Sequence, residues 1–248
     1  MGPDGRFWAA DVVGDRIVQI LPDGQCVEVI KAIGNPNGVK VRADGKLIVA
    51  AHKGLLLFDP ATLRIERLKT EHEGEPLTGL NDLALDSSGG VYFTTPIGSS
   101  ILKPTGRVFY RAPDGVITLV ADKLAFPNGI AVAADGESIL VSEFAAKRIL
   151  SIPAIGVKGP FAVSHVFAQT HGGVGADGMI VDSEGRLLAA NLGAREVLVY
   201  DRAAVLIGAI RLPEAAGDYV TNAAFASGYL YLTEARKGEV WRVKLNTR

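Results

Sequence analysis

The sequence has little cysteine, little net charge and no long hydrophobic run. Its 248 residues include a single cysteine, Cys26, which excludes an internal disulfide framework. The 26 Lys and Arg residues nearly balance 27 Asp and Glu residues, and no basic stripe could follow a phosphate backbone, so we expect no nucleic-acid partner. The longest apolar runs, such as residues 46–51, are too short to cross a bilayer, which predicts no membrane association.

Several functional motifs are missing as well. The four histidines show no His-x-x-x-His or cysteine-paired spacing, which argues against zinc fingers and zincin-type enzymes. No Gly-x-Ser-x-Gly motif is present, which disfavours an α/β-hydrolase esterase. The first residues lack a charged segment followed by an apolar stretch, so no secretory signal is expected and a cytoplasmic location is predicted. Cys26 lies outside any motif and is predicted to be a buried, unreactive thiol.

What the sequence does contain is a repeat. Short β-rich runs alternate with turn residues, and no window keeps a helical apolar period, so the chain is predicted to be all-β. Five segments share the outline strand, tight turn, strand, and they begin at Asn37, Asn81, Asn128, Asp177 and Asn222. These starts lie 44, 47, 49 and 45 residues apart, which is the length of a propeller blade.

A sixth copy opens the chain, because residues 3–10 match the second half of the outline. We therefore predict one domain, residues 1–248, folded as a six-bladed β-propeller. The N-terminal part of blade one and the closing strand of the last blade are expected to be missing. Six blades of ~45 residues need roughly 270 residues.

The first residues of the repeats are the candidates for chemistry. In a propeller the innermost strand of each blade begins at the mouth of the channel, so Asn37, Asn81, Asn128, Asp177 and Asn222 are expected to form a ring there. Amide and carboxylate oxygens are hard donors that suit Ca²⁺ or Mg²⁺. The alternative is that Asn or Asp before Gly only forms an Asx turn that leads into the strand.

The motifs around these residues resemble those of the SMP-30/gluconolactonase/LRE family, and the resemblance covers essentially the whole chain. They are Leu80-Asn-Asp-Leu-Ala-Leu-Asp86, Phe126-Pro-Asn-Gly-Ile-Ala-Val132, Ala176-Asp-Gly-Met-Ile-Val-Asp182 and Thr221-Asn-Ala-Ala-Phe225. The resemblance implies a catalytic divalent ion held by Asn81, Asn128 and Asp177, and by a Glu from a blade-one Glu-Gly-Pro run that this sequence does not contain. At Asn37 and Asn222 the simple turn is favoured.

By the same resemblance, the reaction is hydrolysis of a sugar lactone such as gluconolactone. The ion, Ca²⁺ first and Mg²⁺, Zn²⁺ or Mn²⁺ as alternatives, would polarise the ring carbonyl and activate water, whose proton Asp177 would accept. Asp82 and Asn37 are candidates to bind the substrate. Phe93-Thr-Thr-Pro96 departs from the family's Phe-Thr-Asp-Pro. We expect a small-molecule lactone as the partner, and a monomer or dimer.

Other interpretations remain open. The same metal site could act on organophosphates or other phosphotriesters. Residues 106–152 also resemble strictosidine-synthase-like propellers, which use no metal, and the Asp-Gly-Met motif at Asp177 favours the lactonase family. A non-catalytic binding scaffold is a further alternative, because fold alone does not decide function. Glu143 and Glu234, at predicted strand ends, are interpreted as structural rather than as additional channel carboxylates.

Overall fold

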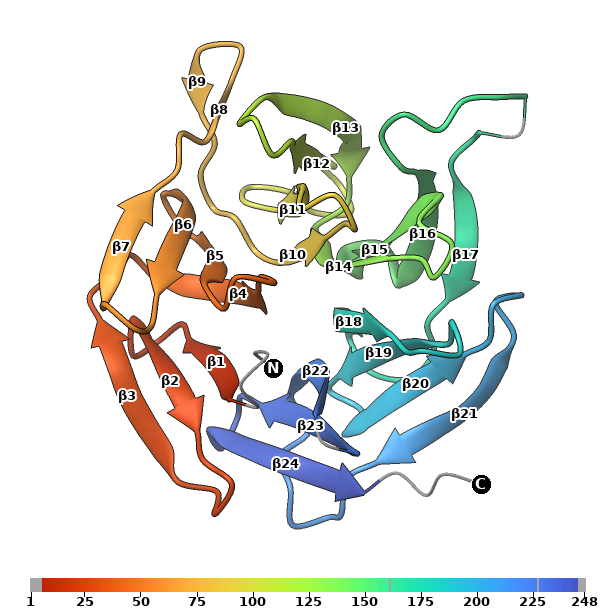
Figure 1. The fold of residues 1–248 in the computed structure, drawn as a ribbon. Coiled ribbons are helices and arrows are strands. Elements are labelled where there is room, and N and C mark those ends of the chain that lie inside the picture. Colours follow the sequence, from red (N-terminus) through yellow and green to blue (C-terminus); the bar gives the residue numbers. More distant parts are fainter. Residues whose placement is uncertain (1–5, 161, 227, 245–248) are drawn as a thin grey trace. The chain divides into compact units, whose positions relative to one another are not determined.

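The computed structural model of the chain describes residues 6–160, 162–226 and 228–244. Within these ranges the strands pair in sequence order, giving four sheets of four strands, two sheets of three strands and one two-stranded hairpin (Figure 1). The chain is an all-β, six-bladed β-propeller, as the repeat predicts. Of the sixth repeat copy predicted over residues 3–10, residues 3–5 lie outside the described residues. In the described part of the chain, no helix has the length and hydropathy that a membrane crossing requires.

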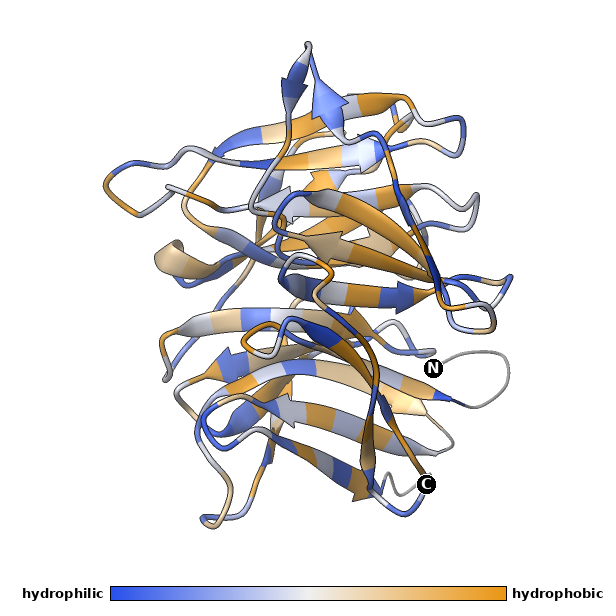
Figure 2. Ribbon diagram, turned by 90° about the vertical axis from the view of Figure 1, so that its left-hand side faces the viewer, coloured by the Kyte–Doolittle hydropathy of each residue, from blue (hydrophilic) through white to orange (hydrophobic). Residues whose placement is uncertain are grey.

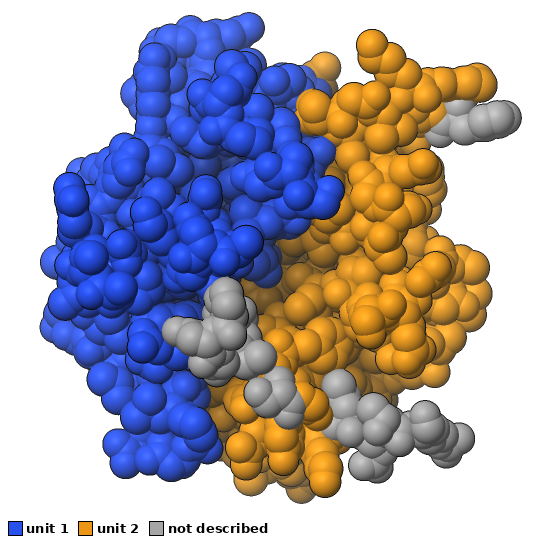
Figure 3. Space-filling view, viewed as in Figure 1, with its two compact units in different colours: residues 1–97, 107–122 blue, residues 98–106, 123–248 orange. Residues whose placement is uncertain are grey.

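The chain divides into two compact units (Figure 3). Unit 1 comprises residues 1–97 and 107–122, and unit 2 comprises residues 98–106 and 123–248. The organisation as one domain stays a prediction.

Unit 1 carries the sheets of the first three repeats. Its strands are β1 (Phe7–Asp11), β2 (Arg16–Ile20), β3 (Cys26–Lys31), β4 (Pro36–Val41), β5 (Leu47–Ala51), β6 (Gly54–Asp59), β7 (Arg64–Arg67), β8 (Glu71–His72), β9 (Glu75–Pro76), β10 (Leu83–Leu85), β11 (Val91–Thr95), β12 (Gly106–Arg111) and β13 (Ile117–Leu124). Gly106, Lys123 and Leu124, at the ends of β12 and β13, belong to unit 2.

Unit 2 carries the sheets of the last three repeats. Its elements are β14 (Pro127–Val132), β15 (Ser138–Glu143), the short 3₁₀ helix η1 (Phe144–Ala146), β16 (Arg148–Pro153), β17 (His165–Gln169), β18 (Gly175–Val181), β19 (Leu187–Leu192), β20 (Glu196–Tyr200), β21 (Leu206–Arg211), β22 (Val220–Ala226), β23 (Tyr229–Glu234) and β24 (Glu239–Lys244).

The five predicted strand-turn-strand segments are confirmed as antiparallel hairpins. They are β4–β5, β10–β11, β14–β15, β18–β19 and β22–β23. In four of these hairpins the turn has an Asp followed within three residues by a glycine of positive φ, namely Gly45, Gly89, Gly136 and Gly185. Gly136, for example, has φ of 73°, a left-handed conformation that glycine adopts without a steric penalty, and Asp135 accepts the N–H of Glu137 at 2.9 Å.

Burial falls from the first strands of a sheet to the last. Every residue of β5 is buried, whereas every residue of β7 is exposed. The same contrast separates β19 from β21. Figure 2 shows the apolar colour concentrated on the strands and the hydrophilic colour in many of the connecting loops. The prediction of a buried Cys26 is wrong, because this residue begins β3, an edge strand whose side chains are mostly exposed.

The hydrophobic core lies between neighbouring sheets within each unit. In unit 1, Trp8 and Ile17 of the first sheet pack with Val49 and Phe58 of the next. A second cluster in this unit joins Ile48 and Leu55 to Leu83, Phe93 and Phe109. In unit 2, Leu140 and Ile149 pack with Met179 and Tyr200, and Leu188 and Val197 pack with Ala223 and Leu232. Each such aliphatic or aromatic side chain contributes about 1.5–3 kcal/mol when it is fully buried, so this packing holds the first strands in place.

Candidate active site

The first strands of three sheets begin with a β-bulge, and each bulge contains a predicted site residue. In a bulge, two residues of one strand oppose a single residue of its partner, which changes the direction of the side chains there. The register shifts between Pro36 and Val39, between Pro127 and Ile130, and between Ala176 and Met179. The bulged residues are therefore Asn37-Gly38, Asn128-Gly129 and Asp177-Gly178. These site residues occupy equivalent backbone positions, as the repeat predicts.

In unit 2, the glycines after Asn128 and Asp177 allow neighbouring first strands to approach closely. A Cβ atom on Gly129 would lie 2.1 Å from the carbonyl oxygen of Asp177. A Cβ atom on Gly178 would lie 2.3 Å from Cγ of Asn222. Real Cβ atoms do not approach other atoms that closely, so these positions require glycine or a shift of the backbone. Asn128 and Asp177 thus occupy adjacent bulges.

Unit 1 shows the same close approach between Asn37 and the Asn81-Asp82 segment. A Cβ atom on Gly38 would lie 2.8 Å from Oδ1 of Asp82 and 2.9 Å from the carbonyl oxygen of Asn81. Asp82 is 3% exposed, whereas Asn37 is exposed. The structure therefore brings together the three predicted site residues of this unit.

The candidate ligands differ in burial and in local bonding. Asn128 is 6% exposed, while Asn81 and Asp177 are half-buried. Asn222 differs from these residues, because its Oδ1 atom accepts the next backbone N–H at 2.9 Å. The bulge of β22 falls one residue earlier, at Thr221. Asn222 therefore has the geometry of a local turn residue.

A buried serine connects the two bulges of unit 2. Ser142 in β15 is 0% exposed and lies opposite the bulge at Asn128. Its hydroxyl donates a hydrogen bond to the carbonyl oxygen of Ala176, the residue before Asp177. Ser142 is not among the residues predicted from the sequence, because a serine within a strand gives no sign of a partner 34 residues away.

Glu143 and Glu234 are both buried, and their carboxylates accept hydrogen bonds from backbone N–H groups. This agrees with the interpretation of the two glutamates as structural residues. Glu143, 2% exposed, accepts a hydrogen bond from the N–H of Ala125 at 2.7 Å and forms an ion pair with Arg148. Glu234, 1% exposed, accepts hydrogen bonds from three backbone N–H groups, those of Tyr219, Arg236 and Lys237. Buried carboxylates need such donors to offset their lost hydration.

An aromatic pair, Phe126 and Phe144, lies near Asn128 and is not among the residues predicted from the sequence. Phe126 has φ of 58°, which is uncommon for a bulky residue. Its ring centroid lies 5.8 Å from that of Phe144, at a tilt of 52°. Neither the positive φ nor the pairing can be inferred from residue type.

The donor set suits a hard divalent cation. Among the described residues, no three His, Cys, Asp or Glu side chains gather as metal ligands, so a site built from nitrogen or sulfur donors has no support there. The bulges instead present amide and carboxylate oxygens, which Ca²⁺ prefers. The glycines beside them let neighbouring first strands approach closely, which brings these oxygen donors near one another within each unit. Asn128 and Asp177 in unit 2, and Asn81 in unit 1, therefore fit such a cation chemically.

The fold and the candidate site together place the protein in one structural class. It is a β-propeller in which the first strand of several sheets starts with an Asn or Asp side chain. Residues 1–236 match the sequence profile of the SMP-30/gluconolactonase/LRE-like region. The chain belongs to this family, which confirms the resemblance seen in its motifs.

Relatives with known names agree with this family. Lactonase drp35 of Staphylococcus saprophyticus is 32% identical over 222 residues, which span 84% of this chain and 67% of the relative. The solved structure of XC5397 from Xanthomonas campestris, described as a gluconolactonase, has a TM-score of 0.84 at 24% identity and covers 97% of this chain and 82% of its own. Regucalcin from Agrobacterium tumefaciens, described as a calcium-binding protein, has a TM-score of 0.78 at 25% identity and covers 94% and 79%.

Proposed function

We propose that the protein is a divalent-metal-dependent hydrolase that opens a sugar lactone such as gluconolactone, with Ca²⁺ as the metal. By its family and its relatives the protein is a lactonase, since the curated relatives include lactonases from Staphylococcus saprophyticus and Staphylococcus aureus. The observation that carries the finer proposal is the adjacency of the bulges at Asn128 and Asp177.

The proposed metal ligands are Asn81, Asn128 and Asp177. Asn128 and Asp177 are supported by their neighbouring bulges in unit 2, and Asn81 of unit 1 is included on its family motif. Few protein ligands leave coordination positions for water and substrate, as a catalytic site requires. The name of the regucalcin structure, a calcium-binding protein, supports Ca²⁺.

The residues of the chain take distinct roles in this proposal. The metal, when bound, supplies Lewis-acid polarisation of the ester carbonyl and a lower pKa for water. The carboxylate of Asp177 accepts the proton of the attacking water. Its backbone is held by the hydrogen bond from Ser142 to Ala176, so the carboxylate keeps its position. Asp82 and Asn37 bind substrate hydroxyl groups. Action in the cytoplasm, as a monomer or dimer, also stays a prediction.

A titration assay tests this function. Opening of δ-gluconolactone releases acid, so a pH-stat records the rate with native protein, with EDTA, and with EDTA followed by excess Ca²⁺. We expect chelation to lower the rate at least tenfold and Ca²⁺ to restore it. The phosphotriester paraoxon, run in parallel, distinguishes the alternative activity. Opening of gluconolactone at the buffer rate would overturn the proposal, and hydrolysis of paraoxon alone would replace it.

A further inference from the structure

Ser142 lies where the sheet that carries Asn128 meets the sheet that carries Asp177. It belongs to β15 and is 0% exposed. In the register of β14 and β15, Ser142 is the single residue opposite the bulge that contains Asn128. Its hydroxyl donates a hydrogen bond to the carbonyl oxygen of Ala176, the residue before Asp177, in the neighbouring sheet. One buried residue therefore connects the two bulged strands.

Hydroxyl groups at the same position of two other hairpins bind within their own hairpin. The hydroxyl oxygen of Thr94 accepts the N–H of Asp82 at 3.1 Å. The hydroxyl of Thr233 donates to the carbonyl oxygen of Asn222, its partner in the register of β22 and β23, at 3.4 Å. Ser142 instead reaches a strand of the next sheet, 34 residues away. Its bond thus joins two sheets rather than the strands of one hairpin.

The bond acts on the peptide group that joins Ala176 to Asp177. Ala176 is 1% exposed, and a buried carbonyl oxygen that loses a donor gains no water in exchange. Because a peptide group is planar, fixing the Ala176 carbonyl also fixes the N–H of Asp177 and the Cα atom from which its carboxylate extends. The next carbonyl, that of Asp177, lies against the other bulge, 2.1 Å from the position of a Cβ atom on Gly129.

We propose that Ser142 is a positioning residue that couples the Asn128 and Asp177 bulges, so that their side-chain oxygens bind the divalent cation as a preorganised pair. The inference rests on the proposed function and deepens it, because it assigns the relative placement of two ligands to one hydroxyl group. Ser142 acts through the backbone of Ala176 and not on the ion itself. Residues that orient metal ligands in this way typically change metal affinity or activity by about 10–100-fold.

Calcium binding is the first test. The Kd for Ca²⁺ is measured by calorimetry with native protein, Ser142→Ala and Ser142→Cys. We expect Kd to rise about tenfold in both variants. Cysteine fills nearly the same space as serine but is only a weak hydrogen-bond donor. A loss in Ser142→Ala that Ser142→Cys does not share would assign the effect to packing and overturn the inference.

The rate at saturating Ca²⁺ is the second test. The Asp177 carboxylate is displaced in the variants, whereas Asp82 and Asn37, the proposed substrate-binding residues, are unchanged. For δ-gluconolactone, kcat should therefore fall about tenfold, while KM should change less than about threefold. A rise in KM with kcat at its native value would contradict a role in placing Asp177.

The metal-free protein gives a third readout. Amide hydrogen exchange, followed for a peptide that covers β18, reports how firmly the Asp177 bulge is held without Ca²⁺. In Ser142→Ala this peptide should exchange about threefold faster than in native protein. Unchanged exchange would mean that the hydroxyl does not hold the bulge. If Ser142→Ala does not fold, Ser142→Cys decides all three readouts.

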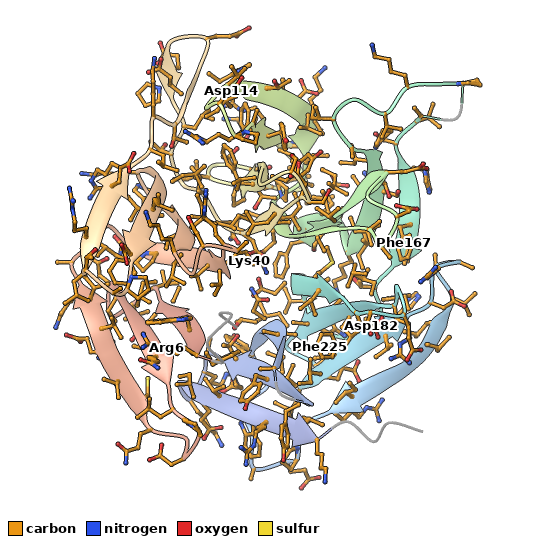
Figure 4. The ribbon with its side chains drawn as sticks, in the orientation of Figure 1. Arg6, Lys40, Asp114, Phe167, Asp182 and Phe225 are labelled. Atoms are coloured by element: carbon orange, nitrogen blue, oxygen red, sulfur yellow. The ribbon has the colours of Figure 1, made fainter. Side chains whose placement is uncertain are left out.

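Ser151→Ala is the matched control. Ser151 is a buried serine of the same sheet, 7% exposed, on the third strand β16, beside the strand β17 on which Figure 4 labels Phe167. Its partner in β15 is Leu140, which does not lie opposite the bulge. Ca²⁺ affinity and kcat should stay within about twofold of native values. Losses equal to those of Ser142→Ala would show a general effect of removing a buried hydroxyl and would overturn the inference.

The outcomes separate the inference from the proposed function. Native Ca²⁺ affinity and kcat in both Ser142 variants would overturn the coupling and leave the lactonase standing. Native protein that binds Ca²⁺ but does not open δ-gluconolactone would overturn the proposed function, and the calcium affinities of the variants would still decide the role of Ser142. Native protein that does not bind Ca²⁺ would overturn both.

Discussion

The two ends of a blade's first hairpin use the same residue types in different ways. At the turn end, Asp44, Asp86, Asp135 and Asp182 each accept backbone N–H groups of their own turn. At the opposite end, Asn37, Asn128 and Asp177 lie in bulges, next to glycines that bring neighbouring strands into contact. The difference teaches that an Asp at the turn end is held by the backbone of its own turn, whereas an Asn or Asp beside Gly at the start of a strand lies in a bulge against the neighbouring first strand, which is where we propose the chemistry.

The largest expected effect contrasts Asp177 and Asp182, at the two ends of β18 and its turn. Asp177→Asn removes the proposed base, so kcat/KM for the lactone should fall at least ~100-fold, the range of general-base catalysis. Asp182→Asn only weakens hydrogen bonds within a turn and the ion pair with Arg186 at 2.7 Å. It should cost about 1 kcal/mol of stability and leave activity within about threefold.

Calcium titration by calorimetry, with thermal unfolding, provides the second readout for these two variants. Asp177→Asn should weaken Ca²⁺ binding, and Asp182→Asn should not. Comparable activities and Ca²⁺ affinities in the two variants would mean that Asp177 at the bulge end has no role in catalysis or metal binding beyond that of Asp182 at the turn end.

Alanine substitutions of two glycines compare the two ends of the β14–β15 hairpin by their effect on the free energy of unfolding. Gly129 lies in the bulge, and Gly136 lies in the turn. A Cβ atom at Gly129 meets the Asp177 carbonyl oxygen at 2.1 Å, so Gly129→Ala must displace a neighbouring strand, at a cost of about 2–3 kcal/mol. Gly136 has open space around its Cβ position but a φ of 73°, so Gly136→Ala should cost about 1 kcal/mol.

Urea unfolding measures the two glycine variants, and the lactonase rate is recorded alongside. Gly129→Ala should also reduce activity, since it moves the Asp177 bulge. A Gly129→Ala variant as stable and as active as native protein would mean that the close approach is unimportant.

The smallest expected effect is on the pH dependence of stability, and it concerns Asp86 in the turn between β10 and β11. Burial alone would raise the pKa of Asp86, but hydrogen bonds from Ser88, Tyr110 and Gly90 outweigh it and lower that pKa below its ordinary value. A carboxylate with a lowered pKa stabilises the fold above its unfolded pKa of about 3.9, and this stability is lost as the pH falls further. Tyr110→Phe removes the 2.7 Å hydrogen bond to Asp86 and should cost about 1 kcal/mol at pH 7.

The pH dependence of unfolding checks this assignment. The stability deficit of Tyr110→Phe should shrink below about pH 4, because Asp86 then becomes protonated in both proteins. A deficit that is constant from pH 7 to pH 3 would assign the loss to another contact of the Tyr110 hydroxyl, such as that with Oγ of Ser88 at 3.5 Å.

The repeat spacing was sufficient to predict the five hairpins and the propeller class. It succeeded because strand length, turns that contain Gly and alternation are local properties of the chain. The prediction for Cys26 failed for the opposite reason. Its strand has an ordinary β pattern, and its exposure depends on β3 being an edge strand, which is a property of the sheet.

The sequence by itself determined the family, the fold class and the identity of the candidate ligands, because motifs and spacings are written along the chain. Only the tertiary structure decided which of those residues lie in bulges, which glycines permit neighbouring strands to touch, and that the hydroxyl of Ser142 binds the backbone next to Asp177. Contacts between residues 18 to 48 positions apart depend on how strands and sheets pack on one another, and residue type at a single position does not encode that packing.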